Sequence, residues 1–166
     1  MTAGPPVASD SCEERLRRLE DIEEIKRLKV RYFEACDGGF GGIRSHIPEE
    51  IADTFTADGE WDGGPHGKRA GRQAIREHYE AVPQCFAYTM LSEPVIDVVG
   101  DRATGRWNLL VYRSRDGVWR LTGGTHHDEY ARTSEGWLIA RTRFVSAVEL
   151  VSETPWNTAG SASKST

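Results

Sequence analysis

The second half of the chain contains four long stretches in which apolar and polar residues alternate. They run over Phe86–Val99, Ala103–Arg115, Val118–Arg132 and Trp137–Val151, and they are rich in Val, Thr, Tyr, Trp and Phe. The sequences between them, GDRAT, SRDG and TSEG, are typical of tight turns. Consecutive strands should therefore pair antiparallel as hairpins, and the pattern predicts a long antiparallel meander.

One long amphipathic helix is predicted ahead of these strands, over Ser11–Cys36. Ser11 and Glu14 form a capping box at its start, and the glycines that follow Asp37 should end it. Its apolar residues recur at intervals of three and four and form a single stripe. The members of this stripe are Leu16, Leu19, Ile22, Ile25, Leu28, Tyr32 and Cys36.

Helices followed by an antiparallel meander indicate an α+β fold. Two shorter helices are expected around Pro48–Phe55 and over Arg72–Ala81, separated by a loop that contains GGPHGKRAG. Helices packed on the concave face of a curved, mostly antiparallel sheet make a cone-shaped α+β barrel. The open end of such a cone is a natural hydrophobic pocket for a small ligand.

Length and charge set the class of protein. A chain of 166 residues and 18.5 kDa fits one domain, expected over residues 13–152, between loosely ordered tails at 1–12 and 153–166. The net charge of −5 argues against nucleic acid or an anionic membrane as a partner. No apolar run approaches the roughly 20 residues that a membrane-spanning helix needs.

The cysteine spacing and the absence of known motifs argue against several kinds of site. Cys12, Cys36 and Cys85 have no CxxC spacing, which fits a reducing compartment and neither a disulfide framework nor a zinc site. The N-terminus has no secretory pattern, so we expect a cytoplasmic protein. The GGFGG run lacks the Lys-Ser/Thr of a phosphate loop and is expected to be a mobile loop. No metal or cofactor is therefore expected.

Three polar positions are candidates for acid–base chemistry. Asp37 falls at the C-terminal end of the long helix, where the helix dipole disfavours a negative charge, although an exposed helix end is an equal alternative. Tyr32 lies on the apolar stripe and should point inward, where many tyrosines only bond the backbone. His126 and His127 are adjacent on a strand, so one faces the interior, as a catalytic group or as a satisfied core histidine.

Strand periodicity also gives candidates for the wall of the pocket. Residues on one face of each strand should line the cone, but such stripes are equally typical of plain core. We expect Arg141 and Arg143 on the opposite face of the last strand. The expected substrate-binding residues are Trp61, Thr89, Trp107, Leu109, Val111, Phe144 and Ser146.

Five segments carry a resemblance to a known family. The chain resembles the SnoaL-like group of the nuclear transport factor 2-like superfamily in IEEIKRLKVRYFEACDGG, FTADGEWDG, TGRWNLLVY, GGTHHDEYAR and GWLIARTRF. The layout is similar to that of bile-acid dehydratases, hexachlorocyclohexane dehydrochlorinases and scytalone dehydratases. The resemblance implies the cone fold. It is weak for the reaction, because this fold hosts dehydratases, isomerases, cyclases, hydrolases and non-enzymes.

The functional residues of these enzymes carry over only in part. Tyr32 falls at the catalytic Tyr of the bile-acid dehydratases, and Asp37 at the carboxylate that supports a catalytic His. That His would fall near Thr89, a second carboxylate at Val111 and an Arg at Ser146, and this sequence has none of the three. The usual Asp–His dyad is therefore not reproduced.

The resemblance places His126 on a cavity-facing strand, which suggests a relocated dyad. In this hypothesis Asp37 orients His126, which acts as general base or acid, and Tyr32 donates a hydrogen bond to a substrate carbonyl or leaving hydroxyl. Thr89 and Trp107 would line the pocket beside them.

The leading interpretation is a cofactor-independent lyase or isomerase, of the dehydratase type. Its substrate would be a hydrophobic, hydroxylated or keto-bearing polycycle or polyketide. One alternative is a non-catalytic binding or accessory domain with a degenerate site. A hydrolase or cyclase would be favoured if Asp97, Asp128 or His46 faced the cavity. Packing of sheet against sheet would give a homodimer or homotrimer.

Overall fold

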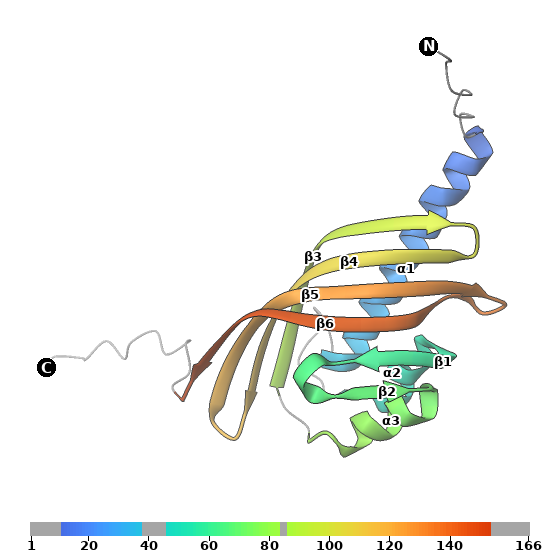
Figure 1. Cartoon of the computed structure of the whole chain (residues 1–166). Coiled ribbons are helices and arrows are strands. Elements are labelled where there is room, and N and C mark those ends of the chain that lie inside the picture. Colours follow the sequence, from blue (N-terminus) through green and yellow to red (C-terminus); the bar gives the residue numbers. More distant parts are fainter. Residues whose placement is uncertain (1–10, 38–45, 84–85, 154–166) are drawn as a thin grey trace, which may run out of the picture.

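The computed structural model describes residues 11–37, 46–83 and 86–153. Apart from Ser11, Cys12 and Glu153, the predicted tails lie outside these residues, as do the GGFGG run and Cys85. In chain order, the elements are α1 (Cys12–Asp37), α2 (Pro48–Asp53), β1 (Phe55–Asp62), the 3-10 turn η2 (Gly64–His66), β2 (Lys68–Ala70), α3 (Arg72–Ala81), β3 (Phe86–Val99), β4 (Arg102–Arg115), β5 (Val118–Thr133) and β6 (Gly136–Ser152) (Figure 1).

The described strands form one curved sheet in the order β2-β1-β6-β5-β4-β3. Strands β3 to β6 pair antiparallel with their neighbours in sequence, which confirms the predicted meander and its turns. The long helix precedes the meander in the chain, and the helices lie against one side of the sheet (Figure 1). This arrangement confirms the predicted α+β cone.

The sequence prediction was wrong for the segment between α2 and α3. Phe55, expected at the end of a helix, instead begins β1, and the expected loop contains β2. β1 pairs in parallel with β6, with Trp61 opposite Thr142, and β2 pairs antiparallel with β1. Burial along β1 does not alternate strictly, and its partner is distant in sequence, so no local period-two pattern marks it.

Helix α1 begins with the predicted capping box. The backbone N–H of Ser11 donates to Glu14 Oε2 at 2.7 Å, and the N–H of Glu14 donates to Ser11 Oγ at 3.1 Å. The first turns extend past the edge of the sheet (Figure 1), and Leu16 and Leu19 are 56% and 61% exposed there. Only the second half of the predicted apolar stripe therefore contributes to the core.

That second half packs across the concave face of the sheet and is fixed by Asp21. Trp137 Nε1 donates to Asp21 Oδ1 at 3.1 Å, and Arg132 Nη2 lies 2.6 Å from the same oxygen. These contacts join α1 to the β5–β6 hairpin and set which helix residues face which strand. The core around this contact consists of Ile25, Leu28, Tyr32, Ala35, Ile51, Phe55, Trp61, Ile75, Ala103, Tyr130, Trp137 and Ile139.

The two faces of the sheet differ as the strand periodicity predicts. His126 and Asp128 on β5 are buried, whereas His127 between them is exposed. On β6, Arg141 and Arg143 lie on the outer side, where Arg141 Nε is 3.5 Å from Glu60 Oε2. Among the described helices, none combines the length and the apolar character that crossing a membrane requires.

Candidate active site

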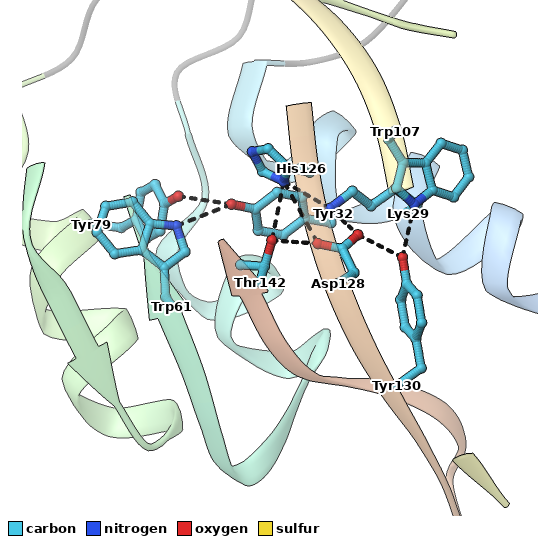
Figure 2. A network of polar contacts seen from close by, with 9 residues as sticks. All are labelled: Lys29, Tyr32, Trp61, Tyr79, Trp107, His126, Asp128, Tyr130 and Thr142. Carbon is cyan, nitrogen blue, oxygen red and sulfur yellow. Dashed lines mark hydrogen bonds and ion pairs between the residues drawn. The ribbon is translucent and has the colours of Figure 1, made fainter. Parts of the chain in front are cut away.

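A fully buried ion pair joins α1 to β5. Lys29 Nζ lies 2.6 Å from Asp128 Oδ2, and both side chains have 0% exposed surface. Figure 2 shows Lys29 reaching from the helix toward the strand that carries Asp128 and His126. Removing two charges from water costs several kcal/mol for each ion, so such a pair is tolerated only where other hydrogen bonds complete it.

Two hydroxyl groups also donate to the Asp128 carboxylate. Thr142 Oγ1 donates to Oδ1 at 2.6 Å, and the Tyr130 hydroxyl donates to Oδ2 at 2.6 Å. The Tyr130 oxygen in turn accepts from Trp107 Nε1 at 3.0 Å. Burial favours a raised pKa for Asp128, but the Lys29 ammonium and the hydrogen bond from Thr142 hold that pKa below its usual value. Asp128 is therefore a carboxylate.

Close packing on β4 is needed for this arrangement. A Cβ at Gly105 would lie 2.8 Å from the Tyr130 ring and 3.2 Å from Trp107 Nε1. A glycine at this position therefore lets the Tyr130 hydroxyl reach both Trp107 and Asp128.

The ring of His126 contacts the lysine of the ion pair through Nδ1. Its Nδ1 is 2.9 Å from Lys29 Nζ and 3.1 Å from Thr142 Oγ1. The ring centroid is 5.4 Å from that of Phe33 and 5.5 Å from that of Phe144. His126 is 7% exposed, so its ring is largely removed from water, with aromatic rings beside it and polar groups at Nδ1.

The contacts of His126 determine where its proton lies. Burial and the adjacent Lys29 ammonium lower the pKa of the imidazole to about 3, so the ring is neutral near pH 7. An ammonium can only donate, so Nδ1 accepts from Lys29 and the ring proton resides on Nε2. No described residue forms a hydrogen bond with Nε2. Nε2–H is thus a donor without a partner among the described residues.

A second chain of polar groups lies beside the first. Trp61 Nε1 donates to the Tyr32 hydroxyl at 3.2 Å, and the hydroxyls of Tyr32 and Tyr79 are 3.1 Å apart. Burial raises the pKa of Tyr32 well above its ordinary value, so the phenol keeps its proton. The Tyr32 and His126 rings are 6.4 Å apart, which places both candidate donors in one region (Figure 2).

The structure brings together only part of the predicted site. Tyr32 and His126 point inward, and Trp61, Trp107 and Phe144 surround them. Trp61 and Trp107, predicted to contact substrate, use their N–H groups on Tyr32 and Tyr130.

Asp37 occupies the predicted helix end and is buried. The carboxylate beside the imidazole is Asp128, whose Oδ1 is 3.9 Å from Nδ1 of His126. Asp37 is not among the described contacts of His126, so their partnership stays a prediction.

The other predicted wall residues lie farther along the sheet. Leu109 is buried one inward position beyond Trp107. Thr89 pairs with Val111 toward the β4–β5 turn, and both are half-buried. Ser146, paired with Gly124, is exposed.

Sequence reasoning missed Lys29, although a signal for it exists. Lys29 stands between Ile25 and Tyr32 at intervals of four and three, so it is a charged residue on the apolar stripe. Asp128 follows His126 at a strand interval of two and therefore shares its inner face. A lysine and a carboxylate that fall on buried faces each indicate that a charged or polar partner lies nearby, without identifying it.

Of the other residues named for the hydrolase alternative, Asp97 is exposed. His46 is half-buried, with its Nε2 2.7 Å from the backbone oxygen of Tyr79. Within residues 11–37, 46–83 and 86–153, no group of three or more His, Cys, Asp or Glu side chains is placed to hold a metal ion.

The sequence profile of the SnoaL-like domain matches residues 17–143. The chain belongs to the SnoaL-like domain family. Its structure is similar to that of a type 2 hexachlorocyclohexane dehydrochlorinase, LinA, with 16% identity, 83% of this chain and 93% of that chain covered, and a TM-score of 0.71. That degree of identity shows a common fold.

Two structures from Novosphingobium aromaticivorans are also similar. One, provisionally named a scytalone dehydratase, has 21% identity, 80% and 88% coverage of the two chains and a TM-score of 0.68. The other is a nuclear transport factor 2-like protein with a cystatin-like fold, with 26% identity, 82% and 90% coverage and a TM-score of 0.63. The SnoaL-like domain predicted from the sequence is confirmed.

Proposed function

We propose that this SnoaL-like protein is a cofactor-independent lyase or isomerase of the dehydratase type. Its substrate would be a hydrophobic, hydroxylated or keto-bearing polycyclic or polyketide molecule. The observation that carries the proposal is the neutral imidazole of His126, which lies between aromatic rings and whose Nε2–H has no partner among the described residues. Two similar structures carry names that denote eliminations, a dehydrochlorinase and a dehydratase.

The chemistry needs an acid–base group and a hydrogen-bond donor in a site removed from water. A proton next to a carbonyl becomes acidic only when the developing enolate oxygen is stabilised. His126 would exchange protons with the substrate at Nε2, as general acid or base. If Tyr79 donates to Tyr32 as Trp61 does, the hydroxyl proton of Tyr32 is the donor to the enolate oxygen. Little water competes in this site, so each hydrogen bond is stronger than at the surface.

Asp37 keeps a place in the proposal as a candidate base or orienting carboxylate. If it acts with His126, Asp37→Asn should lower turnover while His126 keeps its contacts with Lys29 and Thr142. If Asp37→Asn has wild-type turnover, orientation of the imidazole belongs to Lys29, Thr142 and Asp128 alone.

The hydrolase alternative receives less support. Asp128 does face the interior, but three protein donors occupy its oxygens and it is 3% exposed. A carboxylate in this state is poorly placed to attack a substrate or to activate a water molecule.

The test is a panel of hydroxy-ketones assayed for loss of water, with His126→Ala beside His127→Ala. The neighbouring His127 is exposed on the outer face of the same strand and is a matched control. Turnover should disappear in His126→Ala, with ligand binding still measurable, and should persist in His127→Ala. Saturable binding by the wild-type protein without product at any pH would instead establish the alternative, a binding domain. We further expect assembly as a homodimer or homotrimer and a cytoplasmic location.

A further inference from the structure

His126 alone is a poor acid–base group. Its basic nitrogen, Nδ1, is committed to the Lys29 ammonium at 2.9 Å, and its other nitrogen already carries the proton. A second proton on the ring is disfavoured, because burial and Lys29 lower the pKa of His126 to about 3. Loss of Nε2–H without replacement would leave an imidazolate, which is equally unfavourable. Proton transfer near neutral pH therefore needs a second group.

We propose that Lys29 is that group, and that Lys29 and His126 act together as a single acid–base unit whose proton leaves and returns at Nε2. The inference rests on the proposed function and deepens it. Lys29 touches no substrate in this scheme, so it is a positioning residue that acts through His126.

The relay moves one proton in and one proton out through the two ring nitrogens of His126. In the acid form Lys29 is an ammonium, Nδ1 has a lone pair and Nε2 holds a proton. When Nε2–H passes to a leaving oxygen of the substrate, a proton moves from Lys29 Nζ to Nδ1. Lys29 is then a neutral amine and His126 a neutral imidazole protonated on Nδ1. The reverse sequence takes a proton from substrate carbon and restores the ammonium, and neither imidazolium nor imidazolate forms.

The neighbouring side chains offer hydrogen-bond partners to both protonation states of the Lys29–His126 pair. Thr142 donates its own hydroxyl proton to Asp128, so its oxygen has a lone pair that can accept from Nδ1–H at 3.1 Å. Lys29 Nζ can accept from the same hydrogen at 2.9 Å. Asp128 stays a carboxylate throughout, held by Tyr130 and Thr142. Because the Lys29 side chain has no exposed surface, its proton exchanges through His126.

The other titratable groups near the pair are fixed in one state around neutral pH. Burial raises the pKa of Tyr32, Tyr79 and Tyr130 well above their ordinary values. It also raises the pKa of Cys36 to about 12. Asp128 is ionised, as described above, and His127 acts on His126 from the opposite face of β5. Burial lowers the pKa of Lys29 itself, although Asp128 offsets part of that effect.

The test is a pH titration of the full-length protein by NMR, with ¹⁵N-labelled histidine and ¹³Cε-labelled lysine. It needs no substrate, so its outcome is independent of whether the proposed reaction is correct. At neutral pH the His126 spectrum should show Nε2 protonated and Nδ1 unprotonated. As pH rises, the two nitrogen signals should exchange character at the same midpoint at which the Lys29 carbon signal shifts. A ring protonated on Nδ1 or on both nitrogens at neutral pH would overturn the proposal, as would a Lys29 transition with no change in His126.

Two variants sharpen the result. Lys29→Met removes the obligatory donor to Nδ1, so wherever the ring is neutral His126 should adopt the Nδ1–H form, donating to Thr142, with no change of tautomer as the pH rises. Lys26→Met is the matched control, since Lys26 lies on the same helix and is partly exposed; its His126 titration should match the wild-type curve. A Lys29→Met protein that retains the wild-type titration would contradict the relay. Should that variant not fold, the wild-type titration decides alone.

Discussion

Lys29 Nζ on α1 lies 2.6 Å from Asp128 Oδ2 on β5, and neither side chain has exposed surface. This contact joins the longest described helix to the middle of the sheet, and it brings a positive charge to the ring of His126. The pair therefore has a structural role and an electrostatic role at once. Measurements of stability and of its pH dependence separate these two roles.

The first prediction concerns stability. Lys29→Met leaves the Asp128 carboxylate buried without its cation, and breaking a buried pair in this way costs about 3–5 kcal/mol. The double variant Lys29→Met/Asp128→Leu removes both charges and should recover most of that loss. Urea unfolding of the two variants, with Lys26→Met as the surface control, measures the difference. Equal stability of Lys29→Met and Lys26→Met would show that the pair contributes nothing.

The second prediction concerns pH. Folding lowers the pKa of His126 from 6.5 to about 3, so between these values the unfolded chain binds a proton that the folded protein does not. Stability should be full above pH 6.5 and should fall as the pH decreases through this window, by about 1.4 kcal/mol per pH unit. Urea unfolding of wild type and His126→Gln across this range isolates the effect. Parallel curves for the two proteins would mean that His126 titrates normally in the fold.

The third prediction concerns Gly105. A methyl group there would lie 2.8 Å from the Tyr130 ring and would displace its hydroxyl from Asp128. Gly105→Ala should cost about 1–3 kcal/mol, the usual range for overpacking. Thr104→Ala, at the exposed neighbouring position, should have wild-type stability. Thermal unfolding of both variants checks this, and an undisturbed melting temperature for Gly105→Ala would show that the ring has room to move.

The fourth prediction concerns Tyr32. Tyr32→Phe removes a proposed donor to the substrate and should lower kcat about 10²- to 10³-fold. It also leaves Trp61 Nε1 without its acceptor, which should cost about 1–3 kcal/mol of stability. Tyr79→Phe removes the neighbouring phenol and should reduce kcat less. If Tyr79→Phe is the more damaging change, the donor has been assigned to the wrong hydroxyl.

Much of the fold follows from local patterns in the sequence. Contacts between nearby residues produce the capping box at Ser11, the tight turns and the alternation along Phe86–Val99. Each of these predictions is confirmed. Strand β1 could not be found in this way, because its pairing with β6 depends on residues far away in the chain.

The candidate site could likewise be predicted from the sequence only in part. Periodicity placed Tyr32 and one of the two adjacent histidines inside, since the side-chain direction within a helix or strand is a local property, and the family resemblance selected His126. The contact of Lys29 with Asp128 depends on how α1 lies across the sheet, which Asp21 and Trp137 fix from a distance. No spacing within either segment encodes that alignment.

The central claim is that His126 carries a substrate proton at Nε2. The most direct measurement is the incorporation of deuterium, in heavy water, at the carbon next to the carbonyl of a hydroxy-ketone that the protein binds. Wild type and His127→Ala should exchange this position, and His126→Ala should not. Equal exchange by His126→Ala and wild type, with binding intact in both, would contradict the account.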